Sequence, residues 1–260
     1  MNVNAVIDVP ADGAYFEGHF PGRPILPGVA ELVLVVEALE RATNAPLSLA
    51  GIAFVRLRQI VLPGEHLELS ARTLASGNLR FDLKRAGALV ANGELLLGPI
   101  TVAPAETVRT TVSADPSLAN ELIDLLLPHR APMRFVEKIL ALTTEQLVCD
   151  ASIPARCPLV SDGCVPAVVA LEAAAQAAAA WEALQRRNAA GDAAARIGYL
   201  VALRDVVFYA PQVRADQRLL IRIELDACVP PLSHYRVHVN CGEQLMVVGT
   251  IATFLTDQAA

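Results

Sequence analysis

Residues 15–29 read YFEGHFPGRPILPGV, a loop rich in Gly and Pro that carries a single histidine. His19 has a side chain whose unperturbed pKa of about 6.5 allows proton transfer near neutral pH. From Val29 to about Arg41 the apolar residues recur at helical spacing, so a helix is predicted to begin at Gly28 or just after it. The histidine loop therefore leads directly into an apolar helix.

The segments around this helix predict an α+β fold. Residues 3–9 alternate like a strand, and four further strand-like segments separated by turn pairs follow the helix, at residues 50–60, 66–75, 79–85 and 88–97. One helix followed by an antiparallel meander is an α+β arrangement.

The same order recurs in the second half, after a linker near residues 99–116. A short helix is expected at 117–127, two strands at 134–152, a long Ala-rich helix at 166–187 and further strands at 197–254. LRQIV (57–61) matches LRDVV (203–207), and NGEL (92–95) matches CGEQL (241–245). The chain is thus predicted to hold two copies of one domain, at residues 1–108 and 109–260.

Composition narrows the class of protein. Hydrophobic residues make up 54% of the 260 residues and charged ones 18%, which excludes disorder. No uninterrupted apolar run reaches the roughly 18 residues of a membrane span, and no signal peptide precedes the first strand, so no membrane partner and a cytoplasmic location are expected. A net charge of −6 argues against nucleic acid. The five cysteines form no CxxC pair, so neither a zinc site nor a disulfide framework is indicated.

Both halves resemble the hot-dog-fold 3-hydroxyacyl-acyl-carrier-protein dehydratases of type II fatty-acid synthesis. The resemblance rests on the histidine loop, on LLPHRAPM (126–133), which is similar to the family's N-terminal signature, and on LEAAAQ (171–176), which is similar to its catalytic helix. It implies a double hot dog in which each half wraps an antiparallel sheet around a central helix. In dimers of this family the two helices lie side by side, and each site takes its histidine and its acid from different subunits.

Each half carries one of the two catalytic residues of the family and lacks the other. The family's acid lies fourteen residues after its histidine, where this chain has Val33, whereas Glu172 in the second half lies fourteen residues after Pro158. The resemblance therefore implies one composite site per chain, with His19 as base and Glu172 as the catalytic carboxylate. The site with Val33 and Pro158 is predicted to be inactive, and the halves are expected to form an internal pseudo-dimer that could assemble further.

The residue types suit a dehydration. A neutral imidazole can remove the proton next to a thioester carbonyl, and a backbone N–H at a helix start can stabilise the charge on the carbonyl oxygen, a role that the resemblance gives to Gly28. Glu172 could protonate the leaving hydroxyl or orient it. Gln176 is expected either at the substrate or as a residue that orients Glu172. The mechanism requires neither a metal nor another cofactor.

Other polar residues receive a structural interpretation. Glu31 and Glu37 are expected to be solvated or to act at the helix end, and His129 is expected to be a structural hydrogen-bonding residue. His234 and His238 share one face of a strand but lack a third metal ligand. Five arginines could form a basic rim for an acidic acyl carrier protein and its phosphopantetheine, although solvated strand charges explain most of them: Arg56, Arg58, Arg204, Arg214 and Arg218.

The alanines at 173–180 could leave room for a long or conjugated acyl chain, or could simply allow two helices to pack closely. The chain also resembles, more loosely, a fused form of the heterodimeric dehydratase pairs of aryl-polyene biosynthesis. The expected activity is dehydration of 3-hydroxyacyl thioesters in fatty-acid, polyketide or aryl-polyene synthesis. A hot-dog thioesterase and a non-catalytic carrier-binding or scaffold protein are the alternatives.

Overall fold

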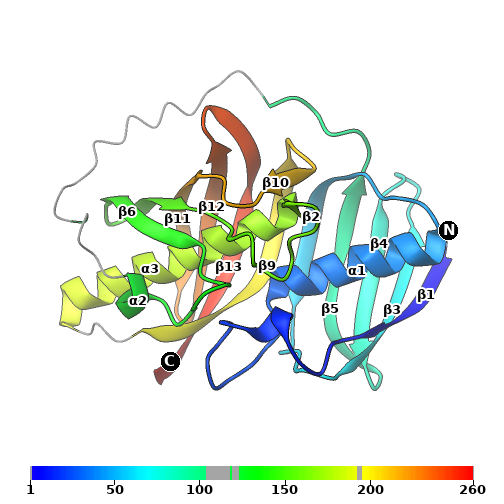
Figure 1. Ribbon diagram of the computed structural model, residues 1–260, viewed down its shortest axis with the longest axis horizontal. Helices are drawn as coiled ribbons and strands as arrows, with labels where there is room; N and C mark the ends of the chain where they lie inside the picture. The colour runs from blue at the N-terminus through cyan, green and yellow to red at the C-terminus, as the bar shows by residue number, and fades with distance from the viewer. Residues whose placement is uncertain (1, 104–117, 119–122, 192–194, 260) are drawn as a thin grey trace.

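A computed structural model describes residues 2–103, 118, 123–191 and 195–259. The first half has the expected order of one strand, one helix and four further strands, but only the last three of these form a meander, because the first of the four pairs with the last (Figure 1). Its helix begins at Gly28, and strand β2 ends three residues earlier than predicted. The elements are β1 (Asn2–Asp8), η1 (Ala14–Phe16), α1 (Gly28–Thr43), β2 (Leu49–Leu57), β3 (His66–Thr73), β4 (Leu79–Arg85) and β5 (Ala88–Leu97).

The second half repeats this order with additions. The predicted boundary at 108/109 and much of the expected helix at 117–127 lie outside the described residues. The elements are α2 (Ile123–Leu126), β6 (Val136–Leu142), β7 (Gln146–Ala151), β8 (Cys164–Pro166), η3 (Ala167–Val169), α3 (Ala170–Ala190), β9 (Arg196–Phe208), β10 (Gln212–Arg214), β11 (Leu219–Val229), β12 (Leu232–Cys241) and β13 (Gln244–Ala259).

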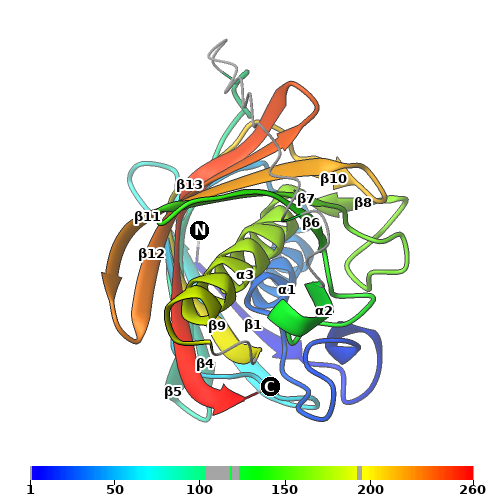
Figure 2. The ribbon, with the colours of Figure 1, turned by 90° about the vertical axis from the view of Figure 1, so that its left-hand side faces the viewer.

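The two halves share one antiparallel sheet. In the described residues its order is β1-β3-β4-β5-β2-β9-β13-β12-β11-β7-β6, so the strand order of the first half is followed by its reverse, with β6 added at the edge. The halves join where β2 pairs with β9, for example at Val55 and Leu203. Figure 2 shows the sheet curving around the two helices. This arrangement confirms the repeat and the double hot dog, with a continuous sheet in place of two separate ones.

Neither of the two short sequence matches between the halves aligns equivalent positions. Residues 57–61 begin at the last residue of β2, whereas residues 203–207 lie inside β9. Residues 92–95 lie inside β5, whereas residues 241–245 span the turn between β12 and β13. Gly242 serves that turn with φ of 58°, but Gly93 lies where a Cβ atom would be 2.7 Å from Val55 on β2. The counterpart of Gly93 is Gly249, whose Cβ would be 2.8 Å from Val206 on β9. Glycine is required for different reasons in the two matched segments, and the short match could not separate them.

The central helices start in the same way. Pro27 before α1 has φ and ψ of −57° and 138°, and Pro166 before η3 and α3 has −53° and 141°. Helix α1 packs on η3, and from there α1 and α3 run in opposite directions (Figure 1). The helices therefore meet near their N-terminal ends rather than packing side by side along their length.

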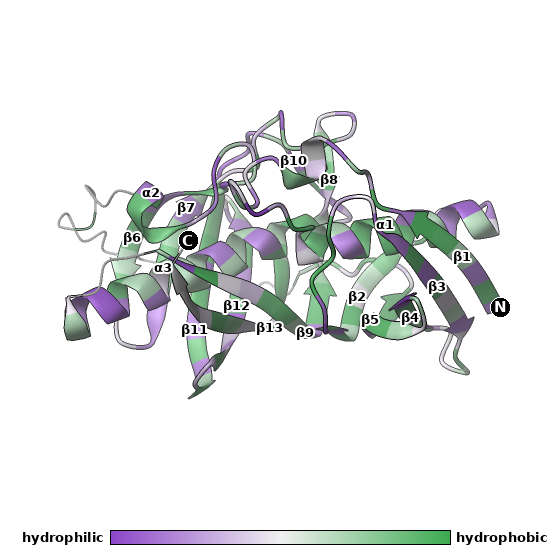
Figure 3. Ribbon diagram, turned by 90° about the horizontal axis from the view of Figure 1, so that it is seen from below, coloured by the Kyte–Doolittle hydropathy of each residue, from purple (hydrophilic) through white to green (hydrophobic). Residues whose placement is uncertain are grey.

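The main hydrophobic core includes buried side chains of both halves, and Figure 3 shows hydrophobic segments in the strands and helices of each. Residues 167–190 are long and apolar enough to cross a membrane by length and composition alone, contrary to the sequence-based expectation. However, 83% of the most apolar stretch of this helix is buried inside the protein, as is typical of a core helix. The burial of α3 within the core also keeps Glu172 away from bulk water.

Candidate active site

His19 lies in the loop between η1 and α1, and its side chain is 7% exposed. Its Nδ1 atom is 3.0 Å from the carbonyl oxygen of Ile25. Because a carbonyl can only accept, Nδ1 carries the proton and Nε2 keeps a free lone pair. Burial lowers the pKa of His19 to about 4, so the imidazole is neutral near pH 7. The loop thus presents a buried, neutral imidazole base.

Glu172 reaches the same place from the first turn of α3. The residue is 3% exposed, and its Oε1 atom lies 3.3 Å from His129 Nε2 and 3.2 Å from Gln176 Nε2. Burial alone would raise the pKa of Glu172, but the hydrogen bond from His129 and the nearby imidazole of His19 outweigh it, and the pKa is lowered. Glu172 is therefore a buried carboxylate that stays ionised.

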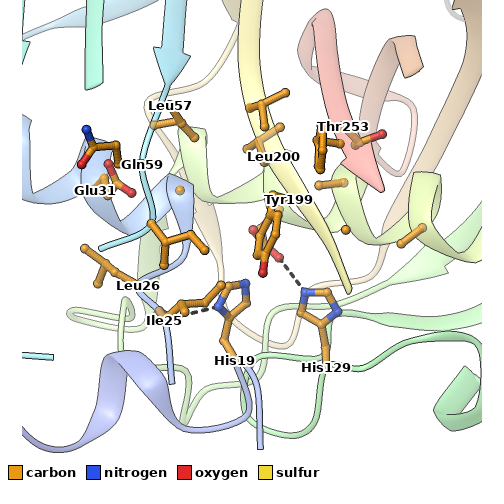
Figure 4. Close-up of a pocket in the computed structure, with 18 of the residues that line it drawn as sticks. His19, Ile25, Leu26, Glu31, Leu57, Gln59, His129, Tyr199, Leu200 and Thr253 are labelled. Carbon is orange, nitrogen blue, oxygen red and sulfur yellow. Dashed lines mark hydrogen bonds and ion pairs between the residues drawn. The ribbon is translucent and has the colours of Figure 1, made fainter. Parts of the chain in front are cut away.

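His19, His129 and Glu172 form one cluster. One nitrogen or oxygen atom from each of the three side chains lies within 4.8 Å of the others. The His19 and His129 rings are 5.2 Å apart between centroids, and Figure 4 shows both at the bottom of the pocket. The composite arrangement predicted for His19 and Glu172 is thus present in the geometry, with His129 as an additional member.

Sequence reasoning missed the place of His129 in this cluster. Its side chain is 5% exposed, and its Nδ1 atom has no hydrogen-bond partner among the described residues. Arg130 fixes the backbone on both sides of the His129 position by donating to the carbonyl oxygens of Leu127 and His129, at 2.7 and 2.8 Å. The histidine was visible in the LLPHRAPM stretch, but its contact with Glu172 depends on the folded chain.

Gln176 acts on Glu172 rather than on the pocket. It has no exposed surface and does not line the cavity. Its amide nitrogen donates to Met133 O at 2.8 Å as well as to Glu172, and its oxygen accepts from the N–H of Phe135 at 2.8 Å. Of its two expected roles, the geometry supports orientation of Glu172 and does not place Gln176 in contact with substrate.

The three side chains of the cluster line a cavity of about 300 Å³, which residues of both halves enclose. Gly28 lines it at the first residue of α1. Ala175 and Ala179 line it from α3 and are only partly buried, unlike the fully buried Ala173, Ala174, Ala177, Ala178 and Ala180. The alanines thus divide by helix face: two face the cavity and the rest pack in the core. The expected close packing of the two helices along this stretch is wrong, because α1 and α3 meet near their N-terminal ends (Figure 1).

Glu31 lies in the first turn of α1, in agreement with the helix-end alternative, but it is not solvated. It is 4% exposed and lines the cavity from α1. Glu37 does lie near the surface, where it pairs with Arg41 at 3.7 Å. Only one of these two acids is therefore solvated.

The second possible site of the repeat, at Val33 and Pro158, carries no comparable cluster among the described residues. Val33 and Pro158 line a separate cavity of about 450 Å³ together with Tyr15, Glu37 and Asp162. No histidine lies among the described residues that line it. The geometry there offers no imidazole base for an acyl substrate.

The cluster of His19, His129 and Glu172 could in principle also offer atoms to a metal ion. It would have to use the free Nε2 atom of His19, because Nδ1 already bonds Ile25. His234 and His238 lie on β12 and belong to no three-residue cluster within the described part of the chain.

Of the five arginines considered for a basic rim, Arg58 lines the cavity and is exposed. Its Nε atom donates to Asn92 at 3.2 Å. Arg218 instead pairs with Asp150 at 2.7 Å, and Arg56 lies over the ring of Phe54. A rim of all five is therefore not formed around this pocket.

Comparison with known families gives the class of this protein. A model described as the ApeP dehydratase (ApeP-like) matches residues 121–260, more than half of the chain, and one described as the ApeI dehydratase (ApeI-like) matches residues 1–94. The chain belongs to the ApeP-like dehydratase family. Its ApeI-like part carries His19 and its ApeP-like part carries Glu172, so it is a fused double hot dog of the ApeI and ApeP type.

Solved structures share the fold over nearly the whole chain. The dehydratase domain of RzxB from Pseudomonas fluorescens has a TM-score of 0.69 at 15% identity, covering 96% of this chain and 93% of its own. The dehydratase domain of PpsC from Mycobacterium tuberculosis, solved in complex with C12:1-CoA, has a TM-score of 0.68 at 16% identity, with coverages of 98% and 94%. A trans-AT PKS dehydratase domain from Brevibacillus brevis has a TM-score of 0.69 at 13% identity, with coverages of 99% and 94%.

Proposed function

We propose that this dehydratase converts 3-hydroxyacyl thioesters to trans-2-enoyl thioesters at one composite site per chain. The observation that carries the proposal is the cluster in which His19 from the first half and Glu172 from the second come within 4.8 Å through their polar atoms. Both side chains line one cavity, and the pKa values of both are lowered, so that His19 is available as a base and Glu172 as a hydrogen-bond acceptor.

His19 removes the proton from C2 of the substrate. Its Nε2 lone pair is free, and the lowered pKa keeps it unprotonated near neutral pH. Negative charge then builds on the thioester oxygen, which the N–H of Gly28 at the start of α1 stabilises. The carbonyl end of the substrate is therefore placed at α1.

Glu172 holds the 3-hydroxyl group. Because its pKa is lowered, Glu172 is a carboxylate that accepts a hydrogen bond from the hydroxyl, and the orienting role is favoured over the acid role. The imidazolium of His19 then gives the proton taken from C2 to the departing oxygen as the C3–O bond breaks. Water leaves, a C2–C3 double bond remains and His19 returns to its neutral form, so that protons balance within one turnover.

This placement gives the substrate a direction. With the carbonyl at Gly28 and the hydroxyl at Glu172, the acyl chain continues along α3 past Ala175 and Ala179, and the thiol carrier extends toward Glu31, Gln59 and Arg58. The exposed guanidinium of Arg58 suits a phosphate or an acidic surface. An acyl carrier protein with phosphopantetheine in the cytoplasm is thus the proposed donor of the substrate.

The assay follows water loss from a 3-hydroxyacyl carrier protein by intact mass. The wild type is expected to lose the mass of one water from the acyl group, and the reverse hydration of the enoyl form should reach the same equilibrium. Release of free carrier thiol without water loss would instead identify a thioesterase. Binding without any mass change would identify the non-catalytic alternative.

A further inference from the structure

Glu31 is a buried acid in the part of the cavity that the reaction does not use. It lies on α1 three residues after Gly28, so both residues lie on one helix face and both line the cavity. Figure 4 draws Glu31 and Gln59 on the first-half side of the pocket, away from Thr253. Under the proposed function, this side receives the thiol carrier rather than the acyl chain.

One oxygen of the Glu31 carboxyl lacks a hydrogen-bond partner among the described residues. The residue is 4% exposed, and the oxygen without a partner is Oε2. A buried polar atom without a partner costs about 1–3 kcal/mol, so such an atom in a binding cavity indicates a missing ligand group.

The neighbouring charges do not satisfy it. Arg85 donates to Glu65 and to the side-chain oxygen of Gln59, each at 2.6 Å, so its guanidinium is already engaged by other groups. Burial raises the pKa of Glu31 well above its usual range, and the negative charge of Glu65 adds to this effect. The positive charge of Arg85 favours the anion, but burial outweighs it. The neutral carboxyl form of Glu31 is therefore favoured, and this form has one O–H donor and one carbonyl acceptor.

We propose that Glu31 binds an amide group of the arm that carries the thioester. An amide offers one carbonyl acceptor and one N–H donor, and a neutral carboxyl offers the complementary pair. Because the N–H and the C=O of a trans secondary amide point in opposite directions, the carboxyl pairs with one of them, either as donor to the carbonyl oxygen or as acceptor from the N–H. The ligand class is a thiol carrier with an amide near its sulfur, as in pantetheine. This inference rests on the proposed function, because the direction of the substrate comes from it.

The test compares two substrates that share one 3-hydroxyacyl group. One is its pantetheine thioester, and the other is its S-ethyl thioester, which has no amide. The measured quantity is the ratio of kcat/KM for the pantetheine substrate to that for the S-ethyl substrate. In Glu31→Leu this ratio should fall about tenfold, whereas Glu31→Gln, which keeps a donor and an acceptor, should stay closer to the wild type. Glu37→Leu, on the same helix but outside this cavity, is the matched control and should leave the ratio unchanged.

A separate binding measurement distinguishes failure of this inference from failure of the proposed function. Calorimetry with an acyl pantetheine thioester that lacks the 3-hydroxyl group needs no turnover, and Glu31→Leu should weaken its affinity about tenfold. An inactive wild type that still shows this loss would overturn the dehydration proposal alone. An unchanged ratio and affinity in Glu31→Leu, or an equal loss in Glu31→Gln, would overturn the role of Glu31.

Discussion

The backbones of Gly18 and Arg130, which belong to different halves of the chain, are in direct contact. The N–H of Arg130 donates to the carbonyl oxygen of Gly18 at 3.0 Å, and a Cβ atom at Gly18 would come 2.1 Å from Arg130 O. The histidine loop and the LLPHRAPM segment are thereby joined, which brings His19 next to His129 and so to Glu172. Glycine is required at this position both by its φ of 81° and by the contact.

Gly18→Ala should therefore damage the site more than a comparable change nearby. The added methyl group meets backbone atoms that cannot move aside, so we expect a loss of about 1–3 kcal/mol in unfolding free energy and a larger relative loss of activity. Gly22→Ala is the matched control, because Gly22 has φ of 75° in the same loop but nothing within 4 Å of its Cβ position. Thermal melts and kcat/KM of both variants check this, and equal effects would contradict the docking role of Gly18.

The acid limb of the pH–rate profile should lie near pH 4. His19 acts as a neutral base and its pKa is lowered to about 4, so the base form persists well below the ordinary value of about 6.5. The lowered pKa of Glu172 acts in the same direction. The profile of kcat/KM for the purified protein, measured under conditions where it stays folded, checks this. A limb at pH 6.5 would mean that the base is not the buried imidazole.

The free energy of unfolding should fall as the pH is lowered from about 6.5 to about 4. In the unfolded chain His19 takes up a proton as the pH falls below about 6.5, whereas in the folded protein it does so only near 4. The unfolded state thus binds more protons between these values, and the free energy of unfolding decreases from pH 6.5 toward pH 4. Denaturant titrations of the wild type and His19→Gln should show a smaller pH dependence in the variant.

His129 should be required to keep Glu172 ionised. Replacing it with Ala removes the hydrogen bond to the carboxylate, so the pKa of Glu172 should rise and the acid limb should move to higher pH. A loss of roughly 10- to 100-fold in kcat is expected. His66→Ala, at an exposed histidine paired with Asp8, is the control. A lower kcat with no shift of the limb would assign His129 to packing alone.

The alanine face of α3 should set the acyl chain length. Ala179→Leu fills the cavity, so kcat/KM should fall about tenfold for long acyl chains relative to short ones. Ala189→Leu, at an exposed position of the same helix, should leave the preference unchanged. Assays across a series of chain lengths check both variants. An unchanged preference in Ala179→Leu would place the acyl chain elsewhere.

The sequence predicted most of this architecture because its signals are local. The alternation in β1, the helical spacing of α1 and the Pro-led helix starts depend only on neighbouring residues, and they predicted these elements to within a few positions. Because Val33 replaces the acid in the first half and Glu172 supplies one in the second, the sequence also predicted that the histidine comes from the first half and the carboxylate from the second.

Other features depend on contacts between distant segments. Glu31 looks like an ordinary first-turn acid in the sequence, and its burial appears only once β2 and the segment that follows it close the cavity over α1. His129 gives no sign of its contact with Glu172. The match between residues 92–95 and 241–245 failed because glycine serves a close strand contact in one segment and a turn in the other.

The central claim is one composite site per chain, and single substitutions on its two sides test it most directly. His19→Ala and Glu172→Gln should each lower dehydration of a 3-hydroxyacyl thioester by at least about 100-fold, whereas Val33→Ala and Pro158→Ala should remain within about twofold of the wild type. The double variant of His19 and Glu172 should be little worse than either single one, because both serve one reaction. Near-wild-type activity in either His19→Ala or Glu172→Gln, or a comparable loss in the Val33 and Pro158 variants, would contradict it.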